Sequence, residues 1–100
     1  MHSEHGGLLV VRVDVRPEDE PELNRWYDTE HLPEKLATPG FVAAARYRSH
    51  DHPGRYLAVY ELDDPATVIS PEYMAQPRSP WTTDVMARWT SWERTVWRRL

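Results

Sequence analysis

The chain of 100 residues contains no cysteine, which excludes a disulfide framework, a thiolate metal site and a thiol nucleophile. Long apolar runs are also missing, since uninterrupted ones such as Leu8 to Val11 span only a few residues. Such a run is far too short for a transmembrane helix or for the core of a signal peptide. We therefore expect a cytoplasmic protein with no membrane partner.

Clustered positive charge is scarce as well. Lys and Arg number 12 against 16 Asp and Glu, which gives a net charge of −4. Only Arg94, Arg98 and Arg99 gather near the end of the chain, and this is too little for the basic footprint of a nucleic-acid-binding domain. Nucleic acid is therefore excluded as a partner, and the chemistry has to come from histidine, acids, tyrosine or arginine.

Aromatic residues are plentiful, with five Trp, five Tyr and one Phe. Their side chains combine a large apolar surface with polar tips, so they suit both a core and the walls of a site for a flat organic ligand. The length is that of one domain with one modest core. We expect residues 1–100 to form a single domain in which residues 1–6 are flexible.

The first half of the chain shows a strand followed by a helix. "LLVVRVDV", Leu8 to Val15, is rich in β-branched residues, and Pro17 with the acids after it marks a helix start. Apolar residues recur at helical spacing up to about His31, and we expect Pro33 to end the helix or to begin a new turn.

The second half predicts a hairpin, several short helices and a last strand. Two alternating segments in residues 41–62, separated by "HDHPG", indicate an antiparallel hairpin. A capping residue precedes a proline three times, at Asp64-Pro65, Ser70-Pro71 and Ser79-Pro80, which favours short helices over one long helix. With a final strand in "TSWERTVWRRL", the order is βαββαβ. We therefore predict an α+β, ferredoxin-like fold with a four-stranded antiparallel sheet.

Side-chain alternation divides each strand into two faces. One face is apolar and should meet the helices. Its centre holds small residues with a rim of phenols, namely Ala43, Ala45 and Ala58 with Tyr47, Tyr56 and Tyr60. Small residues inside a phenolic rim leave space for a ligand, so we predict that the three alanines and Tyr47 bind substrate.

The opposite face of the predicted sheet mixes charged and apolar residues. Its charged members are Arg12, Asp14, Arg46, Arg48 and Glu61. Leu57 and Val59 lie on the same face, so it is too apolar to face open water. A second copy of the chain is the natural cover, and we predict a homodimer.

Several motifs together resemble the dimeric α+β barrel superfamily, nearest to its EthD-like and uncharacterised small-protein branches. These motifs are "WYDTEHLPEKLATPGF", "YLAVYEL" and "SPEYMA". The resemblance implies that two sheets face each other in a dimer and that each subunit keeps a ligand pocket between its sheet and helices. The segment "EHLP", Glu30 to Pro33, matches the part that carries the histidine in EthD-like members, which implies a functional role for His31.

This superfamily includes polyketide cyclases, muconolactone-type isomerases, cofactor-free monooxygenases that form quinones, haem-degrading enzymes and stress-response proteins. The resemblance implies a cofactor-free enzyme that acts on a hydrophobic, aromatic or polyketide-like carbonyl compound by proton transfer through His31. One alternative is a non-catalytic protein, either binding a small ligand or acting in a stress response. Another is a haem protein with His31 as the axial ligand.

His31 is the candidate general acid and base, because its ordinary pKa lies near neutral pH. It follows Tyr27 by four residues, so the two side chains can meet on one helical surface. We predict that Tyr27 and Tyr60 assist it by stabilising an enolate-like oxygen, and that Trp26 and Trp81 help to wall the ligand. The competing interpretation is a histidine that only helps to cap a helix broken at Pro33.

The remaining histidines do not predict a metal site. His2 and His5 lie at the start of the chain, and His50 and His52 lie in a polar turn. Neither pair has a third ligand at a fixed spacing. We interpret all four as solvated surface residues.

Overall fold

The computed structural model of the chain describes residues 6–100, so His2, His5 and the predicted flexibility of the first residues lie outside the described part. In chain order the elements are β1 (Gly7–Asp14), η1 (Pro17–Asp19), α1 (Glu20–Trp26), η2 (Tyr27–His31), α2 (Leu32–Leu36), β2 (Phe41–Arg48), β3 (Arg55–Leu62), η3 (Pro65–Ile69), α3 (Pro71–Met74), α4 (Pro80–Ala87) and β4 (Ser91–Arg98). Among these residues no helix is both long enough and apolar enough to cross a membrane.

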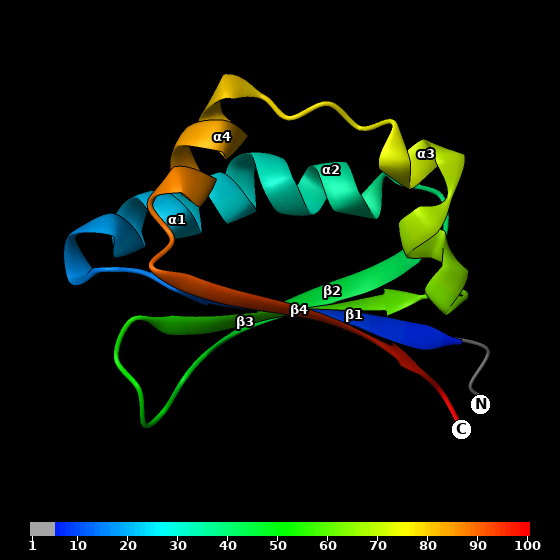
Figure 1. Ribbon diagram of the computed structural model, residues 1–100, viewed down its shortest axis with the longest axis horizontal. Coiled ribbons are helices and arrows are strands. Elements are labelled where there is room, and N and C mark those ends of the chain that lie inside the picture. The colour runs from blue at the N-terminus through cyan, green and yellow to red at the C-terminus, as the bar shows by residue number, and fades with distance from the viewer. Residues whose placement is uncertain (1–5) are drawn as a thin grey trace.

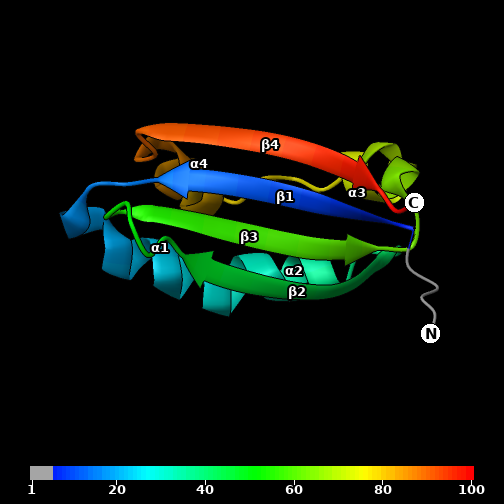
Figure 2. The same cartoon turned by 90° about the horizontal axis from the view of Figure 1, so that it is seen from below.

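The four strands form one antiparallel sheet in the order β2-β3-β1-β4. All the helices cover one face of this sheet (Figure 1), and the view from below shows the other face without any cover (Figure 2). The architecture is the predicted ferredoxin-like α+β fold. Its core lies between the sheet and the helices and consists of Leu9, Val13, Val15, Leu23, Trp26, Tyr27, Phe41, Tyr56, Ala58, Tyr60, Leu62, Val68 and Val85.

The first helical segment runs without a break from residue 20 to residue 36, through Pro33. Pro33 lacks an amide hydrogen, and in a regular α-helix its ring would crowd the carbonyl of Thr29. The turn before it is a π-helix, η2, which closes with a hydrogen bond from the Leu32 amide to the Tyr27 carbonyl. This wider turn accommodates the proline, so the helix neither ends nor starts again there.

The second crossover consists of η3, α3 and α4, as the three capped prolines predict. Asp64 accepts a hydrogen bond from the Ala66 amide at 2.8 Å. The Ser70 and Ser79 hydroxyls likewise accept from amides near the starts of α3 and α4, at 3.2 and 3.0 Å. Each cap satisfies an amide that has no partner inside its helix, which explains why three short elements form where one long helix does not.

Strand β2 contains a bulge. Phe41 pairs with Leu62 and Ala43 pairs with Glu61, so Val42 is an extra residue between two consecutive positions of β3. An extra residue moves every later side chain of a strand to the opposite face. The face prediction for β2 is therefore wrong beyond Phe41.

Ala43, Ala45 and Tyr47 consequently lie on the uncovered face of the sheet, and not under the helices. They are paired with Glu61, Val59 and Leu57, respectively. The Tyr47 side chain is 57% exposed. The prediction that these three residues border a cavity between sheet and helices is wrong for this reason.

Arg46 takes the inward position that the prediction gave to its neighbours. Its guanidinium carbon lies 4.0 Å from the ring centroid of Tyr27 and 5.3 Å from that of Tyr56. Its Nη1 donates a hydrogen bond to the Asn24 side-chain oxygen at 2.9 Å. The prediction that Arg46 lies on the uncovered face is therefore wrong, and the same bulge is the reason.

The uncovered face carries paired charges among apolar side chains. Asp14 contacts Arg12 at 3.0 Å and Arg55 at 2.8 Å. The hydrogen bond from Arg55, helped by the charges of both arginines, lowers the pKa of Asp14 to about 2 against a smaller opposing effect of burial. The exposed large apolar side chains on this face include Leu8, Tyr47 and Trp97.

Because Arg46 packs beneath the helices, its replacement should destabilise the protein more than replacement of Arg48 on the same face of β2. Arg46→Ala removes two cation–π contacts and a hydrogen bond, so we expect it to lower the free energy of unfolding by about 1 to 2 kcal/mol. Arg48→Ala, in the same strand but exposed, should change it by less than about 0.5 kcal/mol. Urea denaturation of the three proteins measures both. Equal effects would contradict the packing of Arg46 described above.

Candidate functional site

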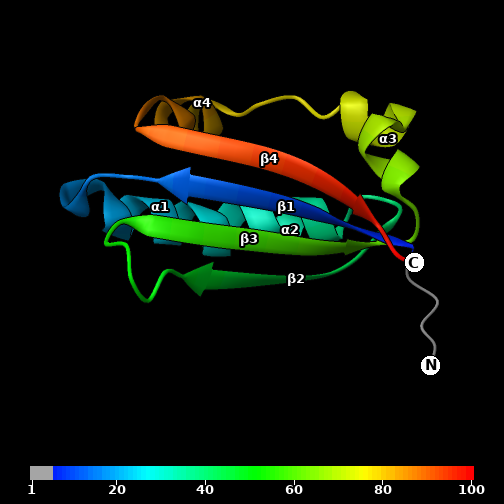
Figure 3. The ribbon, with the colours of Figure 1, turned by 60° about the horizontal axis from the view of Figure 1, so that its bottom comes forward.

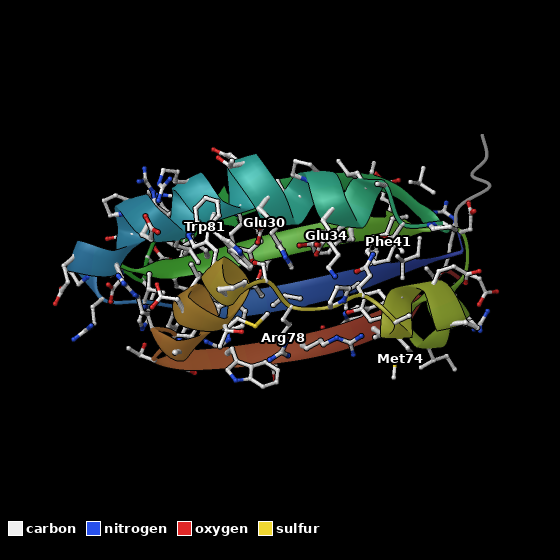
Figure 4. All side chains as sticks on the ribbon, turned by 90° about the horizontal axis from the view of Figure 1, so that it is seen from above. Glu30, Glu34, Phe41, Met74, Arg78 and Trp81 are labelled. Atoms are coloured by element: carbon white, nitrogen blue, oxygen red, sulfur yellow. The ribbon has the colours of Figure 1, made fainter. Side chains whose placement is uncertain are left out.

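A cavity of about 470 Å³ lies between the sheet and the helices. Its floor comes from β1, β3 and β4, and its two walls come from η2 with α2 and from α4. Its roof comes from α3 and the segment that joins α3 to α4 (Figure 4). The lining residues are Leu9, Val11, Tyr27, His31, Glu34, Lys35, Tyr60, Tyr73, Met74, Gln76, Pro77, Arg78, Thr82, Met86, Trp89, Trp92 and Arg94. This volume is typical of a small-molecule site.

His31 lies in the wall of this cavity, at the end of the π-helical segment η2. Its imidazole stacks on Trp26, with ring centroids 4.2 Å apart, and meets the Tyr27 ring edge-on at 5.3 Å. Its Nδ1 is enclosed and has no hydrogen-bond partner among residues 6–100. Burial, with a smaller effect of the Lys35 charge, lowers the pKa of His31 to about 3, so the ring is neutral at physiological pH.

The stack of Trp26 on His31 follows from the π-helical turn and is held by a hydrogen-bond network behind it. His31 follows Trp26 by five positions, and the wider π-turn brings residues at this spacing to the same side of the helix. The Trp26 indole donates to the Thr82 hydroxyl at 3.1 Å. The hydroxyls of Thr82 and Ser79 both donate to the Glu30 carboxylate, at 2.9 and 2.6 Å. This network joins η2 to the first turn of α4 and fixes the wall that carries the imidazole.

Tyr60 and Tyr27 bring two phenols to the same cavity. The Tyr60 hydroxyl is buried and has no hydrogen-bond partner among the described residues. Burial raises the pKa of Tyr60 well above its usual range, and burial, opposed by the charge of Arg46, raises the pKa of Tyr27 to about 12. Both phenols are therefore neutral, and each can donate a hydrogen bond to a ligand oxygen.

Three residues that line the cavity have a buried polar atom without a partner in the described part of the chain: His31, Tyr60 and Trp89, the last at its indole nitrogen. Each such atom typically costs about 1 to 3 kcal/mol. Of these atoms, the Tyr60 hydroxyl and the Trp89 indole nitrogen favour a ligand with polar groups of its own, in addition to apolar surface.

A group of polar residues lies at the α3 end of the cavity. Lys35 donates a hydrogen bond to the Gln76 side chain at 2.6 Å, and its Nζ lies 4.9 Å from the Tyr73 ring centroid. Gln76 in turn donates to the Thr38 hydroxyl. This chain of hydrogen bonds ties the roof segment to the C-terminal end of α2, and burial lowers the pKa of Lys35.

The structure brings together three of the predicted site residues, since His31, Tyr27 and Tyr60 all line the cavity. Trp26 is fully buried behind His31, and Ala58 is buried beneath the helices, so neither lines the cavity.

Trp81 also lies outside the cavity, on the outer side of the helical layer. Its indole donates to Glu22 at 2.8 Å, and the guanidinium of Arg25 lies 4.6 Å from its ring centroid. It fastens α4 to α1, so the prediction that Trp81 walls the ligand is corrected.

The sequence prediction missed several lining residues. Lys35 follows His31 by four residues, so helical spacing could have placed them on one side. Tyr73, Gln76 and Trp89 come from the second crossover, where short capped helices give no periodicity from which to infer facing residues. Only the tertiary structure places them. Among residues 6–100, no group of three or more His, Asp or Glu side chains could hold a metal ion.

The sequence matches no protein-family model and no curated protein sequence. Solved structures do match. A putative antibiotic biosynthesis monooxygenase from Bordetella bronchiseptica has a TM-score of 0.74 at 15% identity, over 96% of this chain and 98% of that chain. SnoaB, a cofactor-independent oxygenase from Streptomyces nogalater, has a TM-score of 0.66 at 18% identity, over 92% and 90%.

A third similar structure is a dimeric ferredoxin-like protein from an uncultured marine organism, with a TM-score of 0.68 at 15% identity over 97% of this chain and 90% of that chain. At such identities the likeness establishes the ferredoxin-like fold. The EthD-like branch remains a prediction.

The lowered pKa of His31 predicts an acid sensitivity of the fold. The folded protein holds the ring neutral down to about pH 3, whereas the unfolded chain takes up the proton near pH 6.5. The stabilisation is thus complete above about pH 6.5 and is lost as the pH falls, by about 1.4 kcal/mol per pH unit. Between pH 7 and pH 5 the wild type should lose about 2 kcal/mol more than His31→Gln in urea denaturation.

His52→Gln is the matched control, since His52 is exposed in the β2–β3 turn. This variant should keep the wild-type pH dependence. An equal loss of stability in the wild type and His31→Gln would show that His31 is not held neutral by burial.

Proposed function

We propose that this protein is a cofactor-free enzyme of the cyclase, isomerase or monooxygenase type. Its substrate is a hydrophobic carbonyl compound, aromatic or polyketide-like. The observation that carries the proposal is that the buried, neutral imidazole of His31 and the unpartnered phenol of Tyr60 line one cavity. The likeness in fold to proteins described as an antibiotic biosynthesis monooxygenase and a cofactor-independent oxygenase supports the same kind of enzyme.

In the proposed first step, His31 accepts a proton from a carbon beside the substrate carbonyl or from a phenol. Because Nδ1 is enclosed, Nε2 is the nitrogen that meets the substrate. The electron pair left behind is delocalised onto the substrate oxygen, to which Tyr60 donates its hydroxyl hydrogen. Burial keeps the ring neutral in the free protein but also makes it a weaker base than an ordinary histidine. The new negative charge on the substrate stabilises the imidazolium and offsets this effect.

The same anion leads to each reaction type. Return of the proton to another carbon gives isomerisation, and attack on a second carbonyl of the same molecule gives cyclisation. In monooxygenation the anion transfers electrons to dioxygen, and a substrate methylene becomes a carbonyl. One oxygen atom then ends in that carbonyl, and the other leaves as water with the two methylene hydrogens. The substrate itself supplies the electrons.

Removal of His31 should slow turnover of a substrate with an acidic methylene. With anthrone as the probe, we expect kcat/KM for oxygen uptake to fall by about 10²- to 10⁴-fold in His31→Ala. Tyr60→Phe should lower it by about tenfold or more, because the developing oxyanion loses a donor. The measurements are oxygen consumption and the mass of the product.

Tyr47→Phe is the control, since it removes a phenol from the uncovered face and should leave the rate unchanged. A folded His31→Ala protein with full turnover would contradict the proposed role. Anthrone that binds to the wild type and is recovered unchanged would favour the non-catalytic, ligand-binding alternative.

We further propose that the uncovered face of the sheet is the interface of a homodimer. Four strands of eight residues give a footprint of about 500 Å² on each subunit, so two copies bury about 1,000 Å² in total from the flat sheet alone. This area reaches the lower limit of a specific interface. Val59 lies centrally on this face, between Val10 of β1 and Ala45 of β2. The dimeric state named for one of the similar structures supports this arrangement.

A charge at the centre of this face should disrupt the dimer. Val59→Asp buries an unpaired carboxylate in the proposed interface, so we expect monomers and a free energy of unfolding lowered by several kcal/mol. Light scattering and thermal melting at matched concentration measure these effects. Ile69→Asp, at an apolar position that is 73% exposed and outside the sheet, should leave both unchanged. A monomeric wild type, or a Val59→Asp dimer with unchanged melting, would overturn the interface.

A further inference from the structure

One part of the cavity lining is positively charged, although the whole chain has a net charge of −4. Three cationic residues line the cavity, and the one acidic residue in the lining is Glu34. The cations are Lys35 from α2, Arg78 from the roof segment and Arg94 from β4. They come from three separate elements, so the fold, and not a local run of sequence, assembles this charge.

These cations lack the carboxylate partners that other arginines of the chain have. Arg25, Arg55 and Arg88 each contact an acidic side chain within 3.3 Å. Within residues 6–100, by contrast, the side chains of Arg78 and Arg94 form no hydrogen bond and no ion pair. The guanidinium carbon of Arg94 lies 6.0 Å from the Tyr73 ring centroid.

Lys35 is only weakly neutralised as well. Its short hydrogen bond goes to the neutral Gln76, and its distance to the Glu34 carboxylate is 4.0 Å. The Lys35 side chain is only 13% exposed, so water screens its charge poorly. Burial lowers the pKa of Lys35, and the charges of Arg78 and Arg94 lower it further against the opposing effects of Tyr73 and Glu34. Arg78 and Arg94 therefore repel Lys35 across the cavity that all three residues line.

We propose that the ligand of this cavity carries a carboxylate, which binds between Lys35, Arg78 and Arg94. An anion there would replace mutual repulsion by charge-assisted hydrogen bonds, and arginine is well suited to hold a carboxylate with two parallel bonds. This inference rests on the proposed function only in taking the same cavity as the substrate site.

The apolar part of the cavity indicates where the rest of such a ligand lies. Met86 and Trp89 line the cavity beside η2, and Trp89 meets Trp26 edge-on at 6.4 Å behind the imidazole of His31. Trp92 and Arg94 are two residues apart on β4 and point to the same side of the strand. A flat ring against the tryptophans thus leaves its carboxylate free to reach the cations. The substrate class is an aromatic or polyketide-like acid.

The test compares 2-naphthoate with 2-naphthamide, two inert probes of nearly equal shape that differ in charge. Isothermal titration calorimetry of the wild-type protein should show about tenfold tighter binding of the carboxylate at low salt, and a smaller preference at high salt. Lys35→Met and Arg94→Met should each remove most of this preference while leaving the affinity for the amide within about twofold.

Arg48→Met is the matched control, because Arg48 also lies on the helix-covered side of an edge strand but does not line the cavity. It should keep the full preference. If Lys35→Met does not fold, Arg94→Met, at an exposed position, still decides the matter. Equal affinity for the two probes, absence of carboxylate binding, or an unchanged preference in Arg94→Met would overturn the proposal. Because these probes do not react, the result is independent of whether His31 catalyses turnover.

Discussion

The stacking of His31 on Trp26 is the contact on which the site depends. Trp26 is fully buried, meets Tyr27 and Trp89 edge-on, and donates its indole hydrogen to Thr82. One side chain therefore fixes the orientation of the imidazole, the wall of the cavity and the position of α4. The π-helical turn makes this possible, because in a regular α-helix residues five apart point in different directions. The desolvation that keeps the imidazole neutral follows from the same packing.

The fold could be predicted because its signals are local and agree with one another. Alternation of burial holds along the full length of β3, and in β1 it is seen in the burial of Leu9 and Val13. The three capped prolines each begin a helix, as such pairs do when the amide of the capped turn has no other partner. The spacing of His31 from Tyr27 predicts that their side chains meet, and they do so in the structure because they lie on neighbouring turns of one helix. The motif resemblance that also indicates His31 stays a prediction.

The face prediction for β2 is wrong because one extra residue in a strand moves every later side chain to the opposite face of the sheet. "FVAAARYR" alternates too weakly to reveal a bulge, since alanines are tolerated on either face, and the extra Val42 moved Tyr47 outward and Arg46 inward. The inward position of Arg46 could not be predicted from the sequence, because its partners Tyr27 and Asn24 belong to a helical segment about twenty residues earlier in the chain. The cationic part of the cavity could not be predicted for a similar reason, since three elements have to pack before it exists.

The strand order has a consequence for self-association. β2 and β4 are the two edges of the sheet (Figure 3), and the outer backbone groups of an edge strand can pair with strands of other molecules. Both edges carry arginines, Arg46 and Arg48 in β2 and Arg94 and Arg98 in β4. Edge strands that approach each other would bring like charges together, which opposes growth of a continuous sheet. The proposed dimer interface uses the apolar surface of the broad face, while these charged edges oppose aggregation into fibres.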